Sequence, residues 1–306
     1  MSAKLIAVVG AHGFVGSAVV DVLLRAGHHL RLLIRRPGHV PPGVETVASK
    51  AGLHDRHALG RLLSGAEAVI HAASYTGSNE KLQQSTNADG TQSLAQMAHQ
   101  LGVGRLIYVS TAGVYGTAFH SGLSEETAPQ PRSRLSASRL AAERSTLDVG
   151  GVVIRPNFVL GEGDRWVLAP YLKLIMRAGG TLSEPRPVAS VINRTGLAQI
   201  ISAMIEEPTL RTHLYHVAEP NPVSLSELAD DILSASLRRP AKRVSRETMK
   251  LTGAHMGFPP HKLELVLTDS WLNTRKLWTE FDHHSLSHPI LTKSDIAWYS
   301  HHIVSA

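Results

Sequence analysis

The sequence contains no cysteine, which excludes disulfide bonds, thiol catalysis and thiolate metal sites. Aromatic residues make up only 5% of the chain, and no apolar run is long enough to span a membrane. The first residues, Met1–Lys4, lead straight into an apolar run, so we expect no signal peptide. These absences favour a cytoplasmic protein with no membrane partner.

The chain is basic, with a net charge of +6 and a pI of about 9.7. Its basic residues are scattered, and they are not interleaved with aromatic residues as in nucleic-acid-binding surfaces. We therefore expect no nucleic-acid partner. The 18 histidines include three adjacent pairs, and none of them has the spacing of metal ligands. We therefore expect no metal site.

The N-terminal segment has the pattern of a dinucleotide-binding unit. Lys4–Val9 is an apolar run typical of a buried strand, and Gly10-x-x-Gly13-x-x-Gly16 follows at once. Ser17–Arg25 has helical periodicity, and Leu30–Ile34 is a second apolar run. Glycines in such a turn permit a tight bend and close approach of the backbone to a pyrophosphate, which the helix N-terminus attracts.

Strand and helix patterns continue to alternate as far as residue 155, which predicts an α/β fold with a doubly wound parallel Rossmann sheet. Proline and glycine become frequent after residue 156, and we expect a smaller, mostly helical C-terminal substrate domain. The predicted NADP-binding domain comprises residues 1–155 and 188–218, and the substrate domain comprises residues 156–187 and 219–306, with a candidate lid at 248–263. The further expected strands are Val44–Val47, Ala68–His71, Arg105–Ser110, Val152–Arg155 and Leu214–Val217, and the further expected helices include Asp55–Leu63, Asn87–Leu101 and Ser136–Asp148.

Five motifs in order make the chain resemble the extended short-chain dehydrogenase/reductases. They are the glycine turn, His71-Ala72-Ala73, Asn87-x-x-Gly90-Thr91, Val109–Gly116 and Arg155–Asp164. The resemblance implies a nicotinamide cofactor. The residues expected to bind it are Gly10, His12, Gly13, Phe14, Val15, Arg35, Arg36, Ala72, Ala73, Arg139, Pro156, Asn157 and Val159.

The end of the second strand indicates which cofactor to expect. An enzyme that prefers NAD usually places a carboxylate there to accept from the ribose hydroxyl. This chain has Arg35-Arg36 instead, and guanidinium groups bind a 2′-phosphate through charge-assisted hydrogen bonds. The sequence therefore predicts NADP(H).

The catalytic motif of the family is incomplete in this chain. The resemblance implies a hydroxyl residue, a tyrosine acid and a lysine; Thr111 matches the hydroxyl position. Ser138 and Glu143 fix the register of the Tyr-x-x-Ser-Lys-x-x-x-Glu motif, and Leu135 and Arg139 then replace the tyrosine and the lysine. Arg139 retains the ability to bind ribose, whereas Leu135 has no proton to give. The expected substrate contacts are Ser74, Tyr75, Tyr115, Phe158 and Trp166.

An intact cofactor half without the Tyr–Lys pair resembles the atypical ketoreductases that act on polycyclic aromatic polyketides of the angucyclinone type. In such a substrate, a phenol beside the ketone supplies the proton that the missing tyrosine would give. We therefore expect an NADPH-dependent ketoreductase with substrate-assisted protonation and a small aromatic polyketide as its partner. Two alternatives remain: a redox-silent sensor that binds NADP(H), and a non-redox cyclase or isomerase.

Overall fold

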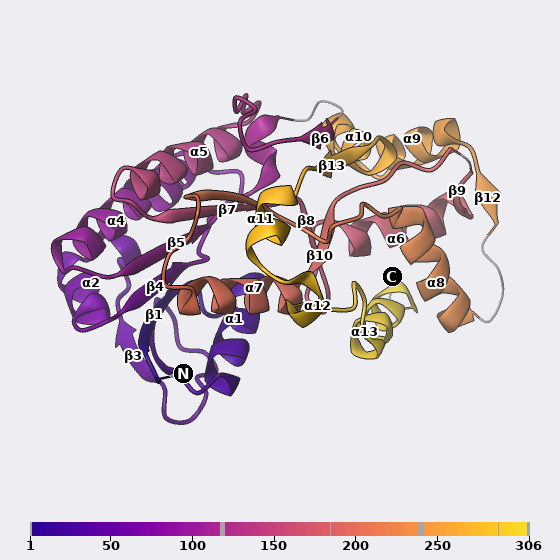
Figure 1. The fold of residues 1–306 in the computed structure, drawn as a ribbon. Coiled ribbons are helices and arrows are strands. Elements are labelled where there is room, and N and C mark those ends of the chain that lie inside the picture. The colour runs from indigo at the N-terminus through magenta and orange to yellow at the C-terminus, as the bar shows by residue number, and fades with distance from the viewer. Residues whose placement is uncertain (1, 117–119, 184, 238–241, 287, 305–306) are drawn as a thin grey trace.

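A seven-stranded parallel sheet forms the centre of the molecule in the computed structural model, which describes residues 2–116, 120–183, 185–237, 242–286 and 288–304 (Figure 1). Most side chains of the central strands are buried and apolar, as expected for a sheet that is covered on both faces. The prediction of a doubly wound α/β fold is confirmed. The strand order across the sheet is β11 (Leu214–Val217), β7 (Val152–Pro156), β5 (Arg105–Val109), β4 (Ala68–His71), β1 (Leu5–Val9), β2 (His29–Ile34) and β3 (Glu45–Ala48).

Helices cover both faces of this sheet (Figure 1). On one face, α1 (Phe14–Arg25) and α7 (Arg194–Glu206) pack side by side and bury their apolar residues against alternate strand residues. On the other face lie α2 (Arg56–Leu63), α4 (Gly90–Gln100) and α5 (Arg134–Leu147). The carboxyl ends of β1, β4, β5 and β7, and therefore the motifs that follow them, meet at one edge of the sheet.

The segment after β4 differs from the expected helix Asn87–Leu101. It contains α3 (Glu80–Leu82) and a π-helix, η2 (Gln83–Asp89), before α4 begins at Gly90. A π-turn widens the helix by one residue and often occurs at functional sites. It departs from the 3.6-residue periodicity by which a helix is recognised in a sequence. α1 also begins three residues earlier than expected, at Phe14.

Much of the C-terminal half forms a second, mostly helical region with its own hydrophobic core around Leu172, Ile232 and Tyr299. Leu277 and Phe281 pack instead in the core of the main sheet. Residues 188–218, predicted to belong with the main sheet, are divided, because β11 joins that sheet but β10 pairs with β8. The division into two functional domains stays a prediction. The strand pairs are β8 (Phe158–Leu160) with β10 (Val191–Asn193), β9 (Thr181–Leu182) with β12 (Arg243–Val244) and β6 (His120–Leu123) with β13 (Ser270–Leu272). The helices are α6 (Leu168–Ala178), α8 (Leu225–Leu237), α9 (Arg246–His255), α10 (Pro260–Leu267), α11 (Arg275–Glu280), α12 (His283–Leu286) and α13 (Lys293–Val304), and two short 3₁₀ turns are η1 (Gly52–His54) and η3 (Ala112–Tyr115).

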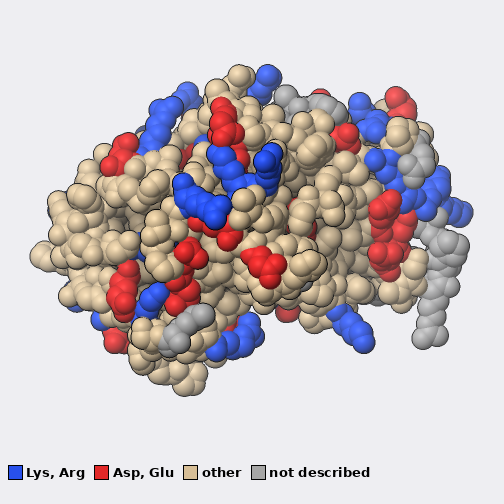
Figure 2. Space-filling model, viewed as in Figure 1, with Lys and Arg blue, Asp and Glu red and all other residues tan. Residues whose placement is uncertain are grey.

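Charged side chains of both signs are interspersed on the face shown in Figure 2. Within the described residues, no helix combines the length and the apolar character that a membrane span requires.

Candidate active site

The glycine turn after β1 is packed so closely that side chains do not fit. Gly10 has φ +91°, and a Cβ atom there would lie 2.6 Å from the backbone nitrogen of Ala73. A Cβ atom at Gly16 would lie 2.1 Å from the Gly10 carbonyl oxygen. Gly10 therefore lets the turn approach the loop after β4, and Gly16 lets α1 approach the turn. The close approach at Gly16 agrees with the predicted close packing of the helix. The approach of this turn to a pyrophosphate stays a prediction.

The N-terminus of α1 is open to an anion. The N-cap residue is Gly13, which has no side chain to cap the helix, and the first turn has no acidic residue. By contrast, the side chains of Asp55, Ser133 and Asn193 cap α2, α5 and α7. Because the first N–H groups of α1 lack a side-chain acceptor, this end of the helix fits the pyrophosphate of a dinucleotide.

The exposed arginines Arg35 and Arg36 follow β2 beside this turn. The stem of Arg35 lies over Gly52, where a Cβ atom would come within 2.8 Å of Arg35 Cδ. The His12 ring lies against Gly38, and its Nε2 is 3.0 Å from the carbonyl oxygen of His39. His12 therefore links the glycine turn to the loop after β2, and its contact with a cofactor stays a prediction.

Asn87 connects the loop after β4 to α5. Its Oδ1 accepts a hydrogen bond from the Tyr75 nitrogen at 2.7 Å, and its Nδ2 donates to Tyr75 O and to Ser138 Oγ, both at 3.1 Å. The amide is 1% exposed and lies in the π-helix η2. The sequence motif contains Asn87 but gives no sign of this positioning role for Ser74 and Tyr75, which we expected to contact substrate.

Thr111 and the first turn of α5 border one small space. Thr111 Oγ1 accepts a hydrogen bond from the Gly113 nitrogen at 3.1 Å. A Cβ atom at Gly113 would lie 3.4 Å from Thr111 Oγ1 and 3.5 Å from Ser136 Oγ. Leu135 precedes Ser136 at the start of the same helix. The structure thus brings the predicted hydroxyl residue next to the helix turn that carries the substituted acid position.

Arg139 reaches inward from α5 towards two buried residues of the sheet, His71 and Tyr108. The Arg139 charge lies close to both residues. Within the described residues, Arg139 Nε and His71 Nδ1 are buried without a hydrogen-bond partner. His71 Nε2 lies 2.8 Å from the hydroxyl of Thr91, which donates its own proton to Asn87 O, so the His71 proton is on Nε2. Burial, assisted by the Arg139 charge, lowers the pKa of His71 to about 3, so this ring is neutral.

A buried polar network joins Tyr115 to residues of α5, β7 and β11. Arg155 donates to Glu143 through Nε at 3.0 Å and Nη2 at 2.5 Å, and to Tyr115 Oη through Nη1 at 2.6 Å. Tyr115 Oη lies 2.6 Å from Nε2 of His216, whose Nδ1 is 3.1 Å from Asn273 O. Burial raises the pKa of Tyr115 to about 12 and lowers that of His216 to about 4.

Two of the predicted substrate contacts, Tyr115 and Phe158, are buried in the structure. Tyr115 is 5% exposed and directs its hydroxyl into the buried network, so its contact with substrate stays a prediction that this geometry does not favour. Phe158 is 6% exposed and belongs to the second hydrophobic core. Both aromatic side chains are held by packing inside the fold. Of the predicted cofactor residues nearby, Pro156 is buried, Val159 is half-buried, and the Asn157 amide donates to Ser270 O at 2.7 Å.

Trp166 differs from these residues because it is 51% exposed. Its ring centre lies 5.6 Å from that of Phe14, the first residue of α1. A pocket of about 220 Å³ lies beside it, with walls from the start of α6 and from the turn between α9 and α10, which includes Met256 and Phe258. The predicted lid segment therefore forms one wall of this pocket, and its movement stays a prediction.

The two buried histidines His71 and His216 are expected to make the fold sensitive to acid. Both stay neutral in the folded chain, since their pKa values are lowered to about 3 and about 4, whereas unfolded histidine binds a proton near pH 6.5. Their stabilising contribution is therefore full above pH 6.5 and falls as the pH drops towards these values, by up to about 1.4 kcal/mol per pH unit for each ring. Urea unfolding at pH 7, 6 and 5 measures this slope. A His216→Asn variant should have a shallower slope than the exposed control His57→Asn; equal slopes would contradict the assignment.

Comparison with known proteins places this geometry in context. The model of the family described as "NAD dependent epimerase/dehydratase family" matches residues 6–172. A 3 beta-hydroxysteroid dehydrogenase/Delta 5→4-isomerase of Mycobacterium tuberculosis is 24% identical over 84% of this chain and 78% of its own length. A 2-alkyl-3-oxoalkanoate reductase of Stenotrophomonas maltophilia is 27% identical over 81% of both chains. Two further relatives are matched over only 43% and 45% of their lengths.

A solved structure shares the whole fold. The Bordetella bronchiseptica enzyme WbmG, crystallised with NAD and UDP, superimposes with a TM-score of 0.75 at 20% identity, over 99% of this chain and 96% of that one. The likeness extends beyond the segment that the family model matches and includes the C-terminal region.

Proposed function

Because the chain belongs to the NAD dependent epimerase/dehydratase family, we propose that it is an NADPH-dependent ketoreductase. The observation that carries this proposal is the uncapped glycine turn with Arg35 and Arg36 beside it. A nicotinamide dinucleotide is supported by solved relatives that were crystallised with NAD. The choice of NADPH rests on the two arginines, which suit a 2′-phosphate.

The residues of this chain fit a reaction in which the protein mainly binds the cofactor and the substrate and orients them towards each other. A bound nicotinamide would supply a hydride to a substrate carbonyl. Thr111, at the start of η3, would orient that carbonyl, and Arg139 would bind ribose hydroxyls from the position of the family's lysine. Positioning alone contributes about 7–11 kcal/mol to such reactions, compared with about 3–5.5 kcal/mol for a general acid. A catalyst without the tyrosine is therefore energetically reasonable.

In this proposal, the substrate itself supplies the proton that the newly formed alkoxide needs. Hydride addition to a ketone carbon gives an alkoxide, and a neighbouring phenol can transfer its proton to that oxygen and later regain one from water. Tyr115 does not provide this proton, because its hydroxyl is buried and its pKa is raised to about 12. Leu135 provides none either.

The substrate class that we propose is a polycyclic aromatic polyketide ketone of the angucyclinone type. Two relatives are named for reactions at carbonyl or hydroxyl carbons, one on a steroid and one on an oxoalkanoate. Trp166, which is 51% exposed and lines the pocket described above, offers a flat surface to a ring system.

Transfer of deuterium from NADPH labelled at the nicotinamide C4 tests this function. With a polycyclic ketone that carries a neighbouring phenol, we expect deuterium at the carbinol carbon of the product. The O-methyl ether of the same ketone should react about 10²-fold to 10⁴-fold more slowly, because it lacks the proton. Leu135→Tyr should change turnover of the phenol little and should favour the ether.

Other outcomes would replace the proposal. Tight NADPH binding with no deuterium transfer to either ketone would favour a redox-silent sensor, which the loss of the Tyr–Lys pair also suits. Substrate conversion that persists without any dinucleotide would favour a cyclase or isomerase.

A further inference from the structure

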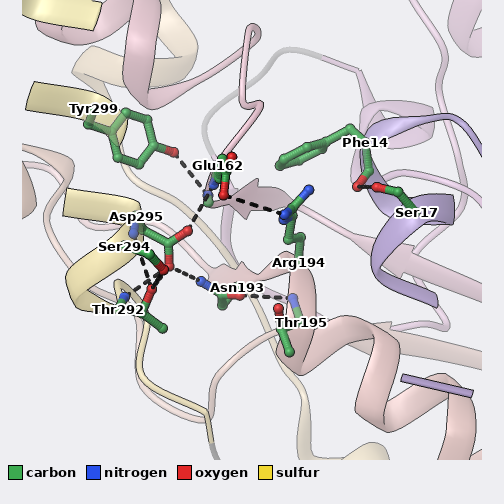
Figure 3. Close-up of polar contacts among 11 residues, drawn as sticks. Phe14, Ser17, Glu162, Asn193, Arg194, Thr195, Thr292, Ser294, Asp295 and Tyr299 are labelled. Carbon is green, nitrogen blue, oxygen red and sulfur yellow. Dashed lines mark hydrogen bonds and ion pairs between the residues drawn. The ribbon is translucent and has the colours of Figure 1, made fainter. Parts of the chain in front are cut away.

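Arg194 lies beside the open N-terminus of α1, although it comes from the C-terminal half of the chain. It is the first residue of α7, which packs along α1. Its guanidinium carbon is 5.9 Å from the centre of the Phe14 ring, and its Nη2 is 3.9 Å from Glu162 Oε2 (Figure 3). The Arg194 side chain is 24% exposed and that of Glu162 is 54% exposed. The positive charge of Arg194 therefore lies next to Phe14, and the carboxylate that it faces is exposed and beyond hydrogen-bond distance.

Asp295 of α13 holds both Glu162 and the residue before Arg194. Its Oδ1 accepts from the Glu162 nitrogen at 2.8 Å, and its Oδ2 accepts from Asn193 Nδ2 at 2.9 Å (Figure 3). Asn193 also caps α7 by accepting from the Thr195 nitrogen at 2.8 Å. Since Asp295 is 5% exposed, it fixes two loops from inside the protein.

The loop Gly161–Asp164 is shaped around the same arginine. Tyr299 Oη accepts from the Gly161 nitrogen and donates to Asp164 Oδ2, both at 3.0 Å. Gly161 has φ +129°, and a Cβ atom there would lie 3.3 Å from Arg194 Cγ. Glycine at this position therefore leaves space for the stem of Arg194 to extend towards the α1 N-terminus.

We propose that Arg194 binds the pyrophosphate of the dinucleotide, and that Glu162 is the carboxylate that pairs with it when no cofactor is bound. A guanidinium is well suited to phosphate because it presents paired donors in a fixed plane. The 3.9 Å separation from Glu162 is longer than a hydrogen bond, so the arginine is free to exchange a carboxylate for a phosphate. This inference rests on the proposed dinucleotide binding and adds a binding residue that the N-terminal motif does not contain.

Calorimetric titration with two ligands tests the assignment. NADPH contains the pyrophosphate, whereas adenosine 2′-monophosphate retains the adenine and the 2′-phosphate but has no pyrophosphate. Arg194→Gln is expected to weaken NADPH binding about 10-fold or more and to leave adenosine 2′-monophosphate within about twofold. Glu162→Gln should tighten NADPH binding, because it removes the competing carboxylate. Arg177→Gln, on the exposed face of α6, is the matched control and should change neither affinity.

The outcomes separate this inference from the proposed function. If the unmodified protein binds neither NADPH nor NADH, the proposed function fails. If it binds NADPH and Arg194→Gln binds it equally well, only the role of Arg194 is overturned. Equal weakening of both ligands by Arg194→Gln would also overturn it, because the arginine would then act on the fold and not on the pyrophosphate.

Discussion

Replacing Arg35 and Arg36 together with aspartate is expected to weaken NADPH binding at least 100-fold and to reverse the preference for NADPH over NADH. Each charge-assisted hydrogen bond to a 2′-phosphate contributes about 1.5–3 kcal/mol, and a carboxylate adds repulsion in its place. The same carboxylate can accept from the free ribose hydroxyl of NADH. Quenching of protein fluorescence or calorimetry gives both dissociation constants for each variant.

Single substitutions divide this effect between the two arginines. Arg35 has its stem over Gly52, and it is therefore the better-positioned residue. We expect Arg35→Asp to carry the larger share. Arg177→Asp introduces the same change of charge on α6, at a distance from β2, and should leave the ratio of the two affinities unaltered. If Arg35→Asp also leaves that ratio unaltered, the arginines are solvated surface residues and the assignment of NADPH is wrong.

Substitution of Glu143 by alanine is expected to destabilise the protein by about 3–5 kcal/mol. Glu143 and Arg155 are 1% and 3% exposed, and the variant leaves the guanidinium buried without its carboxylate. Ser110 Oγ, which donates to Glu143, loses its acceptor as well. The midpoint and slope of urea unfolding at pH 7 measure the loss.

Two control variants show whether the loss of stability comes from the buried charge that is left unpaired. Glu80 and Arg134 form an exposed pair at 3.7 Å, so Glu80→Ala should cost less than about 1 kcal/mol. The double variant Glu143→Leu, Arg155→Met removes both charges and should be more stable than Glu143→Ala. Similar losses for Glu80→Ala and Glu143→Ala would show that burial of the pair has no energetic consequence.

The main sheet can be predicted well from the sequence, because each strand is indicated by the residues of the strand itself. An apolar run such as Ala68–Val69–Ile70 needs only its own residues to indicate a strand buried on both faces, and the structure has β4 at that place. The glycine turn is equally local, since the tight spacing of its atoms involves residues at most six positions apart together with one neighbouring loop. The replacement of the family's tyrosine and lysine by Leu135 and Arg139 is also visible in the register of one helix.

The rest of the candidate site depends on contacts that no local pattern contains. Tyr115 follows the family motif, but its direction is decided by Arg155 and His216, which lie 40 and 101 positions away. Asn87 takes its role from a π-turn, which has no apolar periodicity of its own. For the same reason, Arg194 looks like an ordinary charged residue in the sequence until α7 is packed on α1.

The two parts of the candidate cofactor site, the glycine turn and the region around Arg194 that Asp295 holds, differ in how much chain entropy their formation costs. The Gly13 nitrogen bonds to Gly10 O across three positions, whereas the bond from the Glu162 nitrogen to Asp295 spans 133. Ordering a long loop costs more chain entropy than ordering a short turn, and this cost is recovered only when the surrounding elements have packed. The glycine side is therefore a property of a short segment, whereas the Arg194 side is a property of the complete tertiary structure.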